Sequence, residues 1–306
     1  MAAGIPVGPA YSGIISLSGN FSLFQTPSSI IFTAINNAGV LAGIDTTETS
    51  AAPFGQPILY SNGIETGLPG GAGIPAPCTA VQNETTRGGW SPSAINDAGQ
   101  AVGIVPSFEC ASIGVVASVS GGIQVLSYPG AADLPNGRGV ATTVPAGIND
   151  KGDIVGNVGN SGAPPSFCET GCNDEPEPGS VGFLYSDGQF STFIDPEGVG
   201  TALVSITDSG EIFGNFVDAS GIYHGFSELD GVFQEIDFPG AVSGTFITGV
   251  SSNGRFIVGD SFATNDEEGF LATREAPEPP SGWIMLMGLV GFAMWRLAPR
   301  KERAFA

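Results

Sequence analysis

A short motif that recurs five times along the 306-residue chain limits the fold more than any other feature of the sequence. Its clearest copy is Gly147–Gly156, with the sequence GINDKGDIVG. Asn and Asp bond their own backbone and Gly adopts left-handed conformations, so Asn-Asp-Lys-Gly predicts a tight turn between two short strands. The other copies are Ala34–Gly43, Ala94–Gly103, Ser205–Gly214 and, one residue longer, Gly249–Gly259.

A second hairpin alternates with the first. Two apolar segments flank a two-residue turn of a kind whose twist matches paired strands. These turns are Asn62-Gly63, Gly121-Gly122, Asp187-Gly188 and Asp230-Gly231, and Tyr11–Gln25 predicts an earlier hairpin around Gly19-Asn20. A Pro/Gly loop joins the two kinds of hairpin. We therefore expect each unit to run strand, tight turn, strand, loop, strand, Asn/Asp-x-Gly turn, strand.

The motif glycines set the length of a unit. Gly39, Gly99, Gly152, Gly210 and Gly254 are spaced 60, 53, 58 and 44 residues apart, and inserts account for the longer spacings. About 45 to 50 residues per four-stranded unit is typical of propeller blades, and a closed ring leaves no open sheet edges. We predict an all-β fold over residues 11–274, a β-propeller-like array of about five four-stranded repeats. The two termini would share a closing blade, and a sixth incomplete blade or an open β-solenoid is the alternative.

Composition supports a packed, acidic, turn-rich domain. The chain has 47 Gly and 23 Pro but is 42% hydrophobic, enough for a core. Four of the nine basic residues lie in the last eleven positions, which leaves a net charge of about −24 over residues 1–282. Such a body repels phosphate backbones, so we expect no nucleic-acid partner. Calcium is a low-ranking alternative to having no cofactor, because the acidic clusters Asn173–Glu175 and Asp266–Glu268 lack the spacing of a calcium loop.

The four cysteines are Cys78, Cys110, Cys168 and Cys172. A zinc site would need four converging thiolate or imidazole ligands, and the chain has one histidine. Disulfides are therefore favoured over free thiols if the compartment is oxidising. Cys168–Cys172 with Cys78–Cys110 is the simplest of the three pairings, and the sequence does not choose among them.

The sequence contains no catalytic constellation that stands out. A nucleophile arrangement based on histidine would have to use His224, which we expect to be a strand-end residue. Glycoside hydrolysis needs two carboxylates, but most candidate acids recur at equivalent turn or loop positions, whereas a catalytic pair would break the repeat. The candidate acids are Asp195, Asp208, Asp218, Asp237 and Asp260. We therefore predict no enzyme and no catalytic, cofactor-binding or metal site.

The last segment, residues 275–306, differs from the repeats. A proline-rich break is followed by an apolar run from Trp283 to Trp295 and by a basic tail that begins at Arg296. The run is shorter than the about 20 apolar residues of an ordinary spanning helix. We expect a short hydrophobic helix, with its basic end in the cytoplasm and residues 1–276 outside.

Two resemblances follow from these motifs. The alternation of Gly182–Gly198 with GINDKGDIVG resembles the bacterial extracellular repeats called HAF repeats. The segment His224–Ala241 resembles them even more closely. The resemblance covers roughly residues 11–273. It implies an exported β-propeller-like array with no assigned chemistry, whose repeated glycines and aspartates form turns.

The tail resembles the PEP-CTERM sorting signal through Pro277, Glu278 and Pro279, then Trp283, the apolar run, and Arg296 and Arg300. This resemblance implies that exosortase, a membrane protease of Gram-negative bacteria that make exopolysaccharide, recognises and removes the tail, which is a transient inner-membrane anchor. Such proteins also carry a signal peptide. Residues 1–10 have no basic start and no apolar run, and we interpret them as a leader remnant or a disordered segment.

We therefore expect an extracytoplasmic, non-enzymatic surface or biofilm-matrix protein that binds exopolysaccharide or other envelope components. The alternative is a secreted carbohydrate-active enzyme, a glycosidase or lyase, on the same scaffold.

Overall fold

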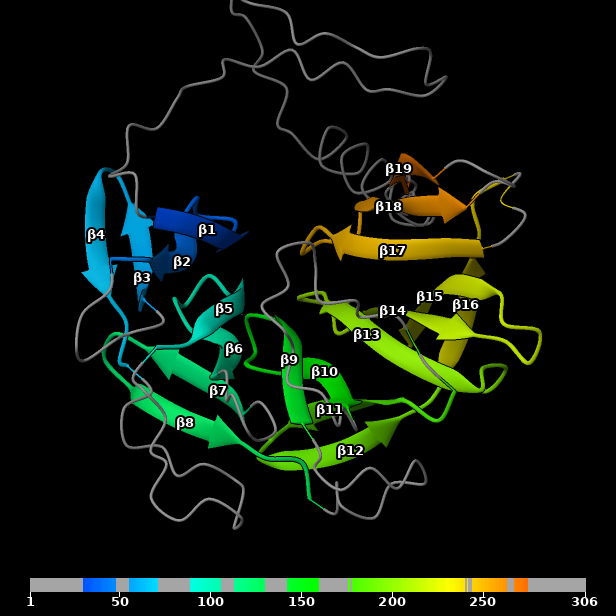
Figure 1. Ribbon diagram of the computed structural model, residues 1–306, viewed down its shortest axis with the longest axis horizontal. Helices are drawn as coiled ribbons and strands as arrows, with labels where there is room; N and C mark the ends of the chain where they lie inside the picture. Colours follow the sequence, from blue (N-terminus) through cyan, green and yellow to red (C-terminus); the bar gives the residue numbers. More distant parts are fainter. Residues whose placement is uncertain are drawn as a thin grey trace, which may run out of the picture. The chain divides into compact units, whose positions relative to one another are not determined.

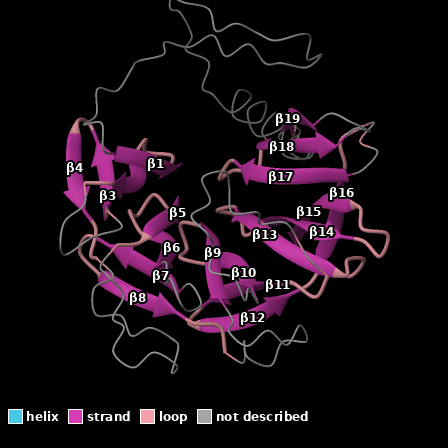
Figure 2. Ribbon diagram, in the orientation of Figure 1, coloured by secondary structure: helices cyan, strands magenta, loops and turns pink. Residues whose placement is uncertain are grey.

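The computed structural model describes residues 30–47, 55–70, 89–105, 113–129, 142–159, 176, 178–239, 241, 244–262 and 267–274. Every regular element in these ranges is a β-strand, as Figure 2 shows, which confirms the all-β prediction. The chain divides into two compact units, Met1–Ala272 and Thr273–Ala306. The strands lie in the first unit, apart from the last residue of β19.

Antiparallel sheets form from strands that follow one another in the chain (Figure 1). Sheet 1 comprises β1 (Ile30–Ile35), β2 (Leu41–Asp45), β3 (Gln56–Ser61) and β4 (Ile64–Gly67). Sheet 2 comprises β5 (Ser91–Ile95), β6 (Ala101–Val105), β7 (Ile113–Ser118) and β8 (Gly122–Leu126). Sheet 3 comprises β9 (Thr142–Ile148), β10 (Ile154–Gly159), β11 (Val181–Ser186) and β12 (Gln189–Phe193).

The last two sheets are linked by one strand pair. Sheet 4 comprises β13 (Gly200–Ile206), β14 (Ile212–Val217), β15 (Tyr223–Leu229) and β16 (Val232–Ile236). Sheet 5 comprises β17 (Gly244–Val250), β18 (Phe256–Phe262) and β19 (Glu267–Thr273). A single parallel pair, Tyr223 with Gly244, links β15 to β17.

The order of the hairpins is as predicted, but the boundary of the unit is not. Each of sheets 1 to 4 begins with the Asn/Asp-x-Gly hairpin and adds the two-residue-turn hairpin, because β10 pairs with β11 and its counterparts do the same. The Pro/Gly loop Asp195–Gly198 therefore connects sheet 3 to sheet 4 instead of lying within one unit.

Both turn predictions are confirmed in detail. In the first hairpin of sheet 3, Gly152 has a φ of +86° and donates its backbone N–H to the Asn149 carbonyl oxygen. The Asn149 Oδ1 atom accepts the backbone N–H of Asp153 at 2.9 Å. In the second hairpin Asp187 and Gly188 have φ values of 50° and 76°, the paired left-handed geometry that matches strand twist.

The last glycine of each motif has a separate function that the sequence did not reveal. Opposite this glycine, the neighbouring strand carries a β-bulge. A Cβ atom on Gly156 would lie 2.2 Å from the Val144 carbonyl oxygen, and one on Gly214 would lie 2.5 Å from that of Ala202. Since no side chain fits at these distances, the bulge requires glycine.

Hydrogen bonds connect the second residues of all five motif turns in a closed circuit. The backbone N–H groups of Asn37, Asp97 and Asp150 donate to the Oδ1 atoms of Asp97, Asp150 and Asp208 at 2.8, 2.8 and 3.1 Å. The Asp208 N–H donates to the Ser252 carbonyl oxygen at 3.1 Å. The Ser252 hydroxyl donates to Asn37 Oδ1 at 2.7 Å, which closes the circuit. Five repeats therefore meet through one ring of turns, as in a β-propeller-like fold.

The hydrophobic core lies between consecutive sheets. Separate clusters join sheets 1 and 2, 2 and 3, 3 and 4, and 4 and 5. Their largest buried members include Trp90, Phe183, Phe213 and Phe226, each at most 1% exposed. The predicted Tyr11–Gln25 hairpin lies outside the described residues, so the closing blade shared by the termini stays a prediction.

Candidate functional site

The functional candidate is a group of polar side chains on the last hairpin of sheet 4. The Asp230-Gly231 turn fixes the register, in which Phe226 of β15 faces Glu235 of β16. His224 lies two residues before Phe226, and Asp237 lies two residues after Glu235. Because side chains alternate along a strand, His224, Glu235 and Asp237 point to the same side of the hairpin.

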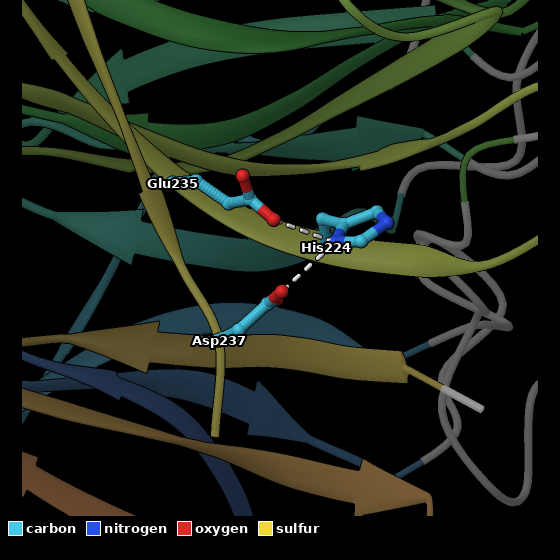
Figure 3. Close-up of side chains that lie close together, drawn as sticks. All are labelled: His224, Glu235 and Asp237. Carbon is cyan, nitrogen blue, oxygen red and sulfur yellow. Dashed lines mark hydrogen bonds and ion pairs between the residues drawn. The ribbon is translucent and has the colours of Figure 1, made fainter. Parts of the chain in front are cut away.

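The three side chains converge on one ring nitrogen, as Figure 3 shows. The His224 Nδ1 atom lies 3.0 Å from Glu235 Oε1 and 3.0 Å from Asp237 Oδ2. One candidate ligand atom from each of the three residues lies within 4.8 Å of the other two. A neutral imidazole carries at most one proton on Nδ1, so it cannot satisfy both carboxylates fully.

The imidazole is held from two further directions. Its ring stacks on Phe216 of β14, with centroids 4.8 Å apart and planes at 17°. Its second nitrogen, Nε2, lies 4.0 Å from Asp218 Oδ2. The Asp218 carboxylate is itself fixed, because its Oδ1 atom accepts the backbone N–H groups of Ser220 and Ile222, both at 2.8 Å.

Three acids near the imidazole have shifted pKa values. The hydrogen bond with Asp237, followed by burial, raises the pKa of Glu235, and the His224 charge acts in the opposite direction. The backbone N–H of Ile222 lowers the pKa of Asp218. Burial raises the pKa of Asp195, which lies in the loop between sheets 3 and 4.

The site is open to solvent. The side chain of His224 is 19% exposed, and those of Glu235 and Asp237 are 49% and 42% exposed. Among the described residues, His224 is the only ion-pair partner of Glu235, Asp237 and Asp218. The group therefore has an excess of negative charge that an approaching cation can reach.

The structure separates the five acids considered as catalytic candidates. Asp218 and Asp237 contact His224, and Asp195 is close enough for the imidazole charge to act on its carboxyl group. Asp208 belongs to the ring of motif turns, whereas Asp260 lies on β18, paired with Phe246.

His224 occupies the second position of β15, which agrees with its interpretation as a strand-end residue. Neither Glu235 nor the convergence of acids on this histidine was predicted from the sequence. Counting outward from the Asp230-Gly231 turn would have found both.

Several predicted features lie outside the residues that the structure describes. They are the sorting motif (Pro277, Glu278, Pro279, Trp283, Arg296 and Arg300), the apolar run and the four cysteines (Cys78, Cys110, Cys168 and Cys172). The side chains of the two acidic clusters considered for calcium lie outside them too. Within the described ranges, no helix has the length and apolar character needed to span a membrane.

Comparison with known proteins adds a distant likeness in fold. No protein-family model matches the sequence, and no curated protein matches it. The chain is similar to TolB from Acinetobacter baumannii, at 13% identity over 80% of this chain and 51% of that chain, with a TM-score of 0.46. It thus spans about half the length of TolB.

A second similar structure is a candidate 6-phosphogluconolactonase from Bacteroides uniformis ATCC 8492. The identity is 11% over 80% of this chain and 68% of that chain, with a TM-score of 0.35. These values are too low to indicate what the present chain does.

Proposed function

We propose that the chain is an exosortase-sorted, extracytoplasmic surface or biofilm-matrix protein of a Gram-negative bacterium. Its function would be to bind exopolysaccharide or another envelope component without catalysing a reaction. One observation carries the proposal: Pro277-Glu278-Pro279, an apolar run that starts at Trp283, and a basic end follow one another in the order of a sorting signal. The apolar run would be a transient membrane anchor.

The repeat domain is consistent with a binding scaffold. Asp97, Asp150 and Asp208 in the motif turns accept backbone hydrogen bonds from neighbouring repeats, so these acids stabilise the fold. The net charge of about −24 over residues 1–282 favours solubility in an exposed setting and disfavours nucleic acid as the ligand.

We favour binding over the alternative of a secreted carbohydrate-active enzyme. Glu235 has a raised pKa beside a second carboxylate, which is one requirement of glycoside hydrolysis. However, both carboxylates lie 3.0 Å from the His224 Nδ1 atom, and one oxygen of each lies within 4.8 Å of the other, whereas the catalytic carboxyl groups of retaining and inverting enzymes lie about 5–5.5 Å and about 6.5–9.5 Å apart. This spacing is shorter than either range, and both carboxylates are directed at the imidazole instead of at a space for a sugar.

The sorting proposal is tested in a native host with and without its exosortase. Cells are fractionated, and the intact mass of the chain is measured in each fraction. We expect an extracellular form that ends near Pro277–Pro279 only when exosortase is present. The released form is then sedimented with the host exopolysaccharide to test binding.

A matched pair of variants makes the result specific. A triple variant of the motif, with Pro277→Ala, Glu278→Gln and Pro279→Ala, should retain the tail and stay in the inner membrane. Pro164→Ala with Pro165→Ala, which changes a proline pair far from the tail, should be processed normally. A cytoplasmic chain with an intact tail in the presence of exosortase would disprove the proposed localisation and sorting.

A further inference from the structure

The side chains around His224 differ from those at the same place in the other repeats. Phe226 pairs with Gly214, the glycine that closes the motif, and the same pair recurs as Ile58 with Gly43, Val115 with Gly103 and Phe183 with Gly156. These pairs put the four sheets in one common register. The positions of His224, Glu235 and Asp237 are then occupied by Gln56, Gly67 and Pro69 in sheet 1, by Ile113, Val125 and Ser127 in sheet 2, and by Val181, Thr192 and Ile194 in sheet 3.

None of these nine residues is a histidine, an aspartate or a glutamate. If the turn geometry required the three polar residues, the other sheets with the same hairpins would have them too. Sheet 4 alone among these four sheets combines one imidazole with two carboxylates. A requirement other than folding therefore explains the set better.

We propose that His224, Glu235 and Asp237 bind a divalent first-row transition-metal ion, for which Zn²⁺ is a suitable probe. One imidazole nitrogen and two carboxylate oxygens are a donor set that such ions accept, whereas calcium and magnesium prefer oxygen alone. The proposal goes beyond the proposed function, since it needs neither export nor tail removal.

The distances fit this assignment. Ligand atoms at adjacent positions of an octahedron, with bonds of about 2.1 Å, lie about 3.0 Å apart. The His224 Nδ1 atom lies 3.0 Å from an oxygen of Glu235 and 3.0 Å from an oxygen of Asp237. Three protein ligands would leave further coordination positions open to water or to a ligand oxygen.

The surroundings of the imidazole support metal binding by Nδ1. A histidine that binds a metal usually directs its other ring nitrogen toward a carboxylate, a carbonyl or water, which fixes the tautomer. Here Nε2 lies 4.0 Å from Asp218 Oδ2, and the Phe216 ring lies parallel to the imidazole.

A direct test exists because His224 is the only histidine of the chain. The full chain, labelled with ¹⁵N and kept in mild detergent, is titrated with Zn²⁺ while the imidazole nitrogens are observed by NMR. We expect saturation at one ion per chain and a large shift of the Nδ1 resonance, with Nε2 remaining protonated. Zinc bound by cysteines elsewhere would leave this signal unchanged.

Variants of the proposed ligands are compared with a control variant of an acid outside the site. Glu235→Gln and Asp237→Asn keep the side-chain shape and should each weaken Zn²⁺ binding at His224 at least about 10-fold, since even indirect partners of a metal contribute this much. A triple variant with His224→Val, Glu235→Thr and Asp237→Ile has the residues of sheet 3 at these positions. It should lose the one Zn²⁺ ion per chain that we assign to this site. The control Glu65→Gln removes an exposed acid of β4 and should bind as the unchanged chain does.

Each outcome decides the matter. A His224 signal that does not respond to saturating Zn²⁺ would overturn the proposal, as would a response that Glu235→Gln and Asp237→Asn both leave unchanged. Binding that fails to saturate below millimolar Zn²⁺ would show only weak attraction to an acidic surface, and it would overturn the proposal too. Export in the host is measured separately, so the failure of one proposal leaves the other intact.

Discussion

Sheets 3 and 4 have the same backbone devices and different chemistry. Both have a second hairpin with an Asp-Gly turn at positive φ, and both have a β-bulge opposite the glycine that closes the motif. Both also have an asparagine directly after that glycine, which binds the backbone of the next sheet. Asn157 bonds to the N–H and carbonyl oxygen of Leu203 at 2.6 and 3.0 Å, and Asn215 bonds to those of Ile247 at 2.7 and 2.9 Å.

The two sheets differ on the side of the hairpin where His224 lies. Sheet 4 has His224, Glu235 and Asp237 at positions where sheet 3 has Val181, Thr192 and Ile194. The residues that build the repeat are thus those that recur, and candidate functional residues are those that interrupt it. The following predictions test this division, and the largest expected effect comes first.

The largest effect should come from Gly156→Ala and Gly214→Ala. The new methyl group would lie 2.2 Å from the Val144 oxygen in sheet 3 and 2.5 Å from the Ala202 oxygen in sheet 4, and in both sheets it would also approach a phenylalanine ring closer than 3.0 Å. We expect each variant to lose about 3 kcal/mol or more of unfolding free energy, or to fail to fold, as measured by urea denaturation followed by circular dichroism.

Gly67→Ala is the matched control, because a methyl group there meets nothing within 4 Å. It should leave the denaturation midpoint nearly unchanged. If only one of the two bulge glycines proved sensitive, sheets 3 and 4 would not share this device.

A smaller loss should follow from Asn157→Ala and Asn215→Ala. Each change leaves a backbone N–H and a carbonyl oxygen without their partner, and a buried unsatisfied group costs about 1–3 kcal/mol. We expect a loss of about 2–3 kcal/mol, larger for Asn215, whose side chain is fully buried, than for the half-buried Asn157. Hydrogen exchange should accelerate first at the Ile247 amide in one variant and at the Leu203 amide in the other. Unchanged exchange at these amides would show that the asparagines do not connect neighbouring sheets.

The sequence predicts the hairpins well because turn chemistry is local. Asn62-Gly63, Asp187-Gly188 and Asp230-Gly231 have the positive φ values that their residue types indicate. The sheet boundary was predicted wrongly, because the loop Asp195–Gly198 is equally compatible with joining two strands of one sheet or two different sheets. Pairing between β10 and β11 decides this, and it spans the insert at 160–180 that no local pattern bridges.

The candidate site was hidden for a similar reason. The sequence shows Asp237 as one of several loop acids and His224 as an isolated histidine. Their proximity depends on hairpin register, and the orientation of the imidazole depends on Phe216 of a third strand. Equivalent positions have to be compared between sheets before the set stands out, and the shifted unit boundary concealed that alignment.

The smallest effect concerns a second interruption of the repeat, at Asp195. Tyr128, Asp195 and Phe238 occupy equivalent positions just after the fourth strand of sheets 2, 3 and 4. Each donates its backbone N–H to a threonine hydroxyl of the next sheet, at 3.0, 2.8 and 2.8 Å. Sheet 3 thus has a carboxyl group, only 3% exposed, where sheets 2 and 4 have aromatic rings. Burial raises the pKa of Asp195, so the folded chain binds this proton more tightly than the unfolded chain does.

The unfolding free energy that depends on Asp195 therefore falls as the pH rises through its folded-state pKa. Asp195→Asn keeps an oxygen for the Glu197 N–H but cannot ionise, so its advantage over the unchanged chain should be absent at low pH and grow toward neutral pH. Asp218→Asn should show the opposite sign, because backbone hydrogen bonds lower the pKa of Asp218 and stabilise the folded chain above the unfolded pKa. Urea midpoints from pH 3 to pH 7, measured with a chelator to keep His224 metal-free, give both differences. If the urea midpoints of the two variants changed in the same direction with pH, the environments of Asp195 and Asp218 would not differ as the structure indicates.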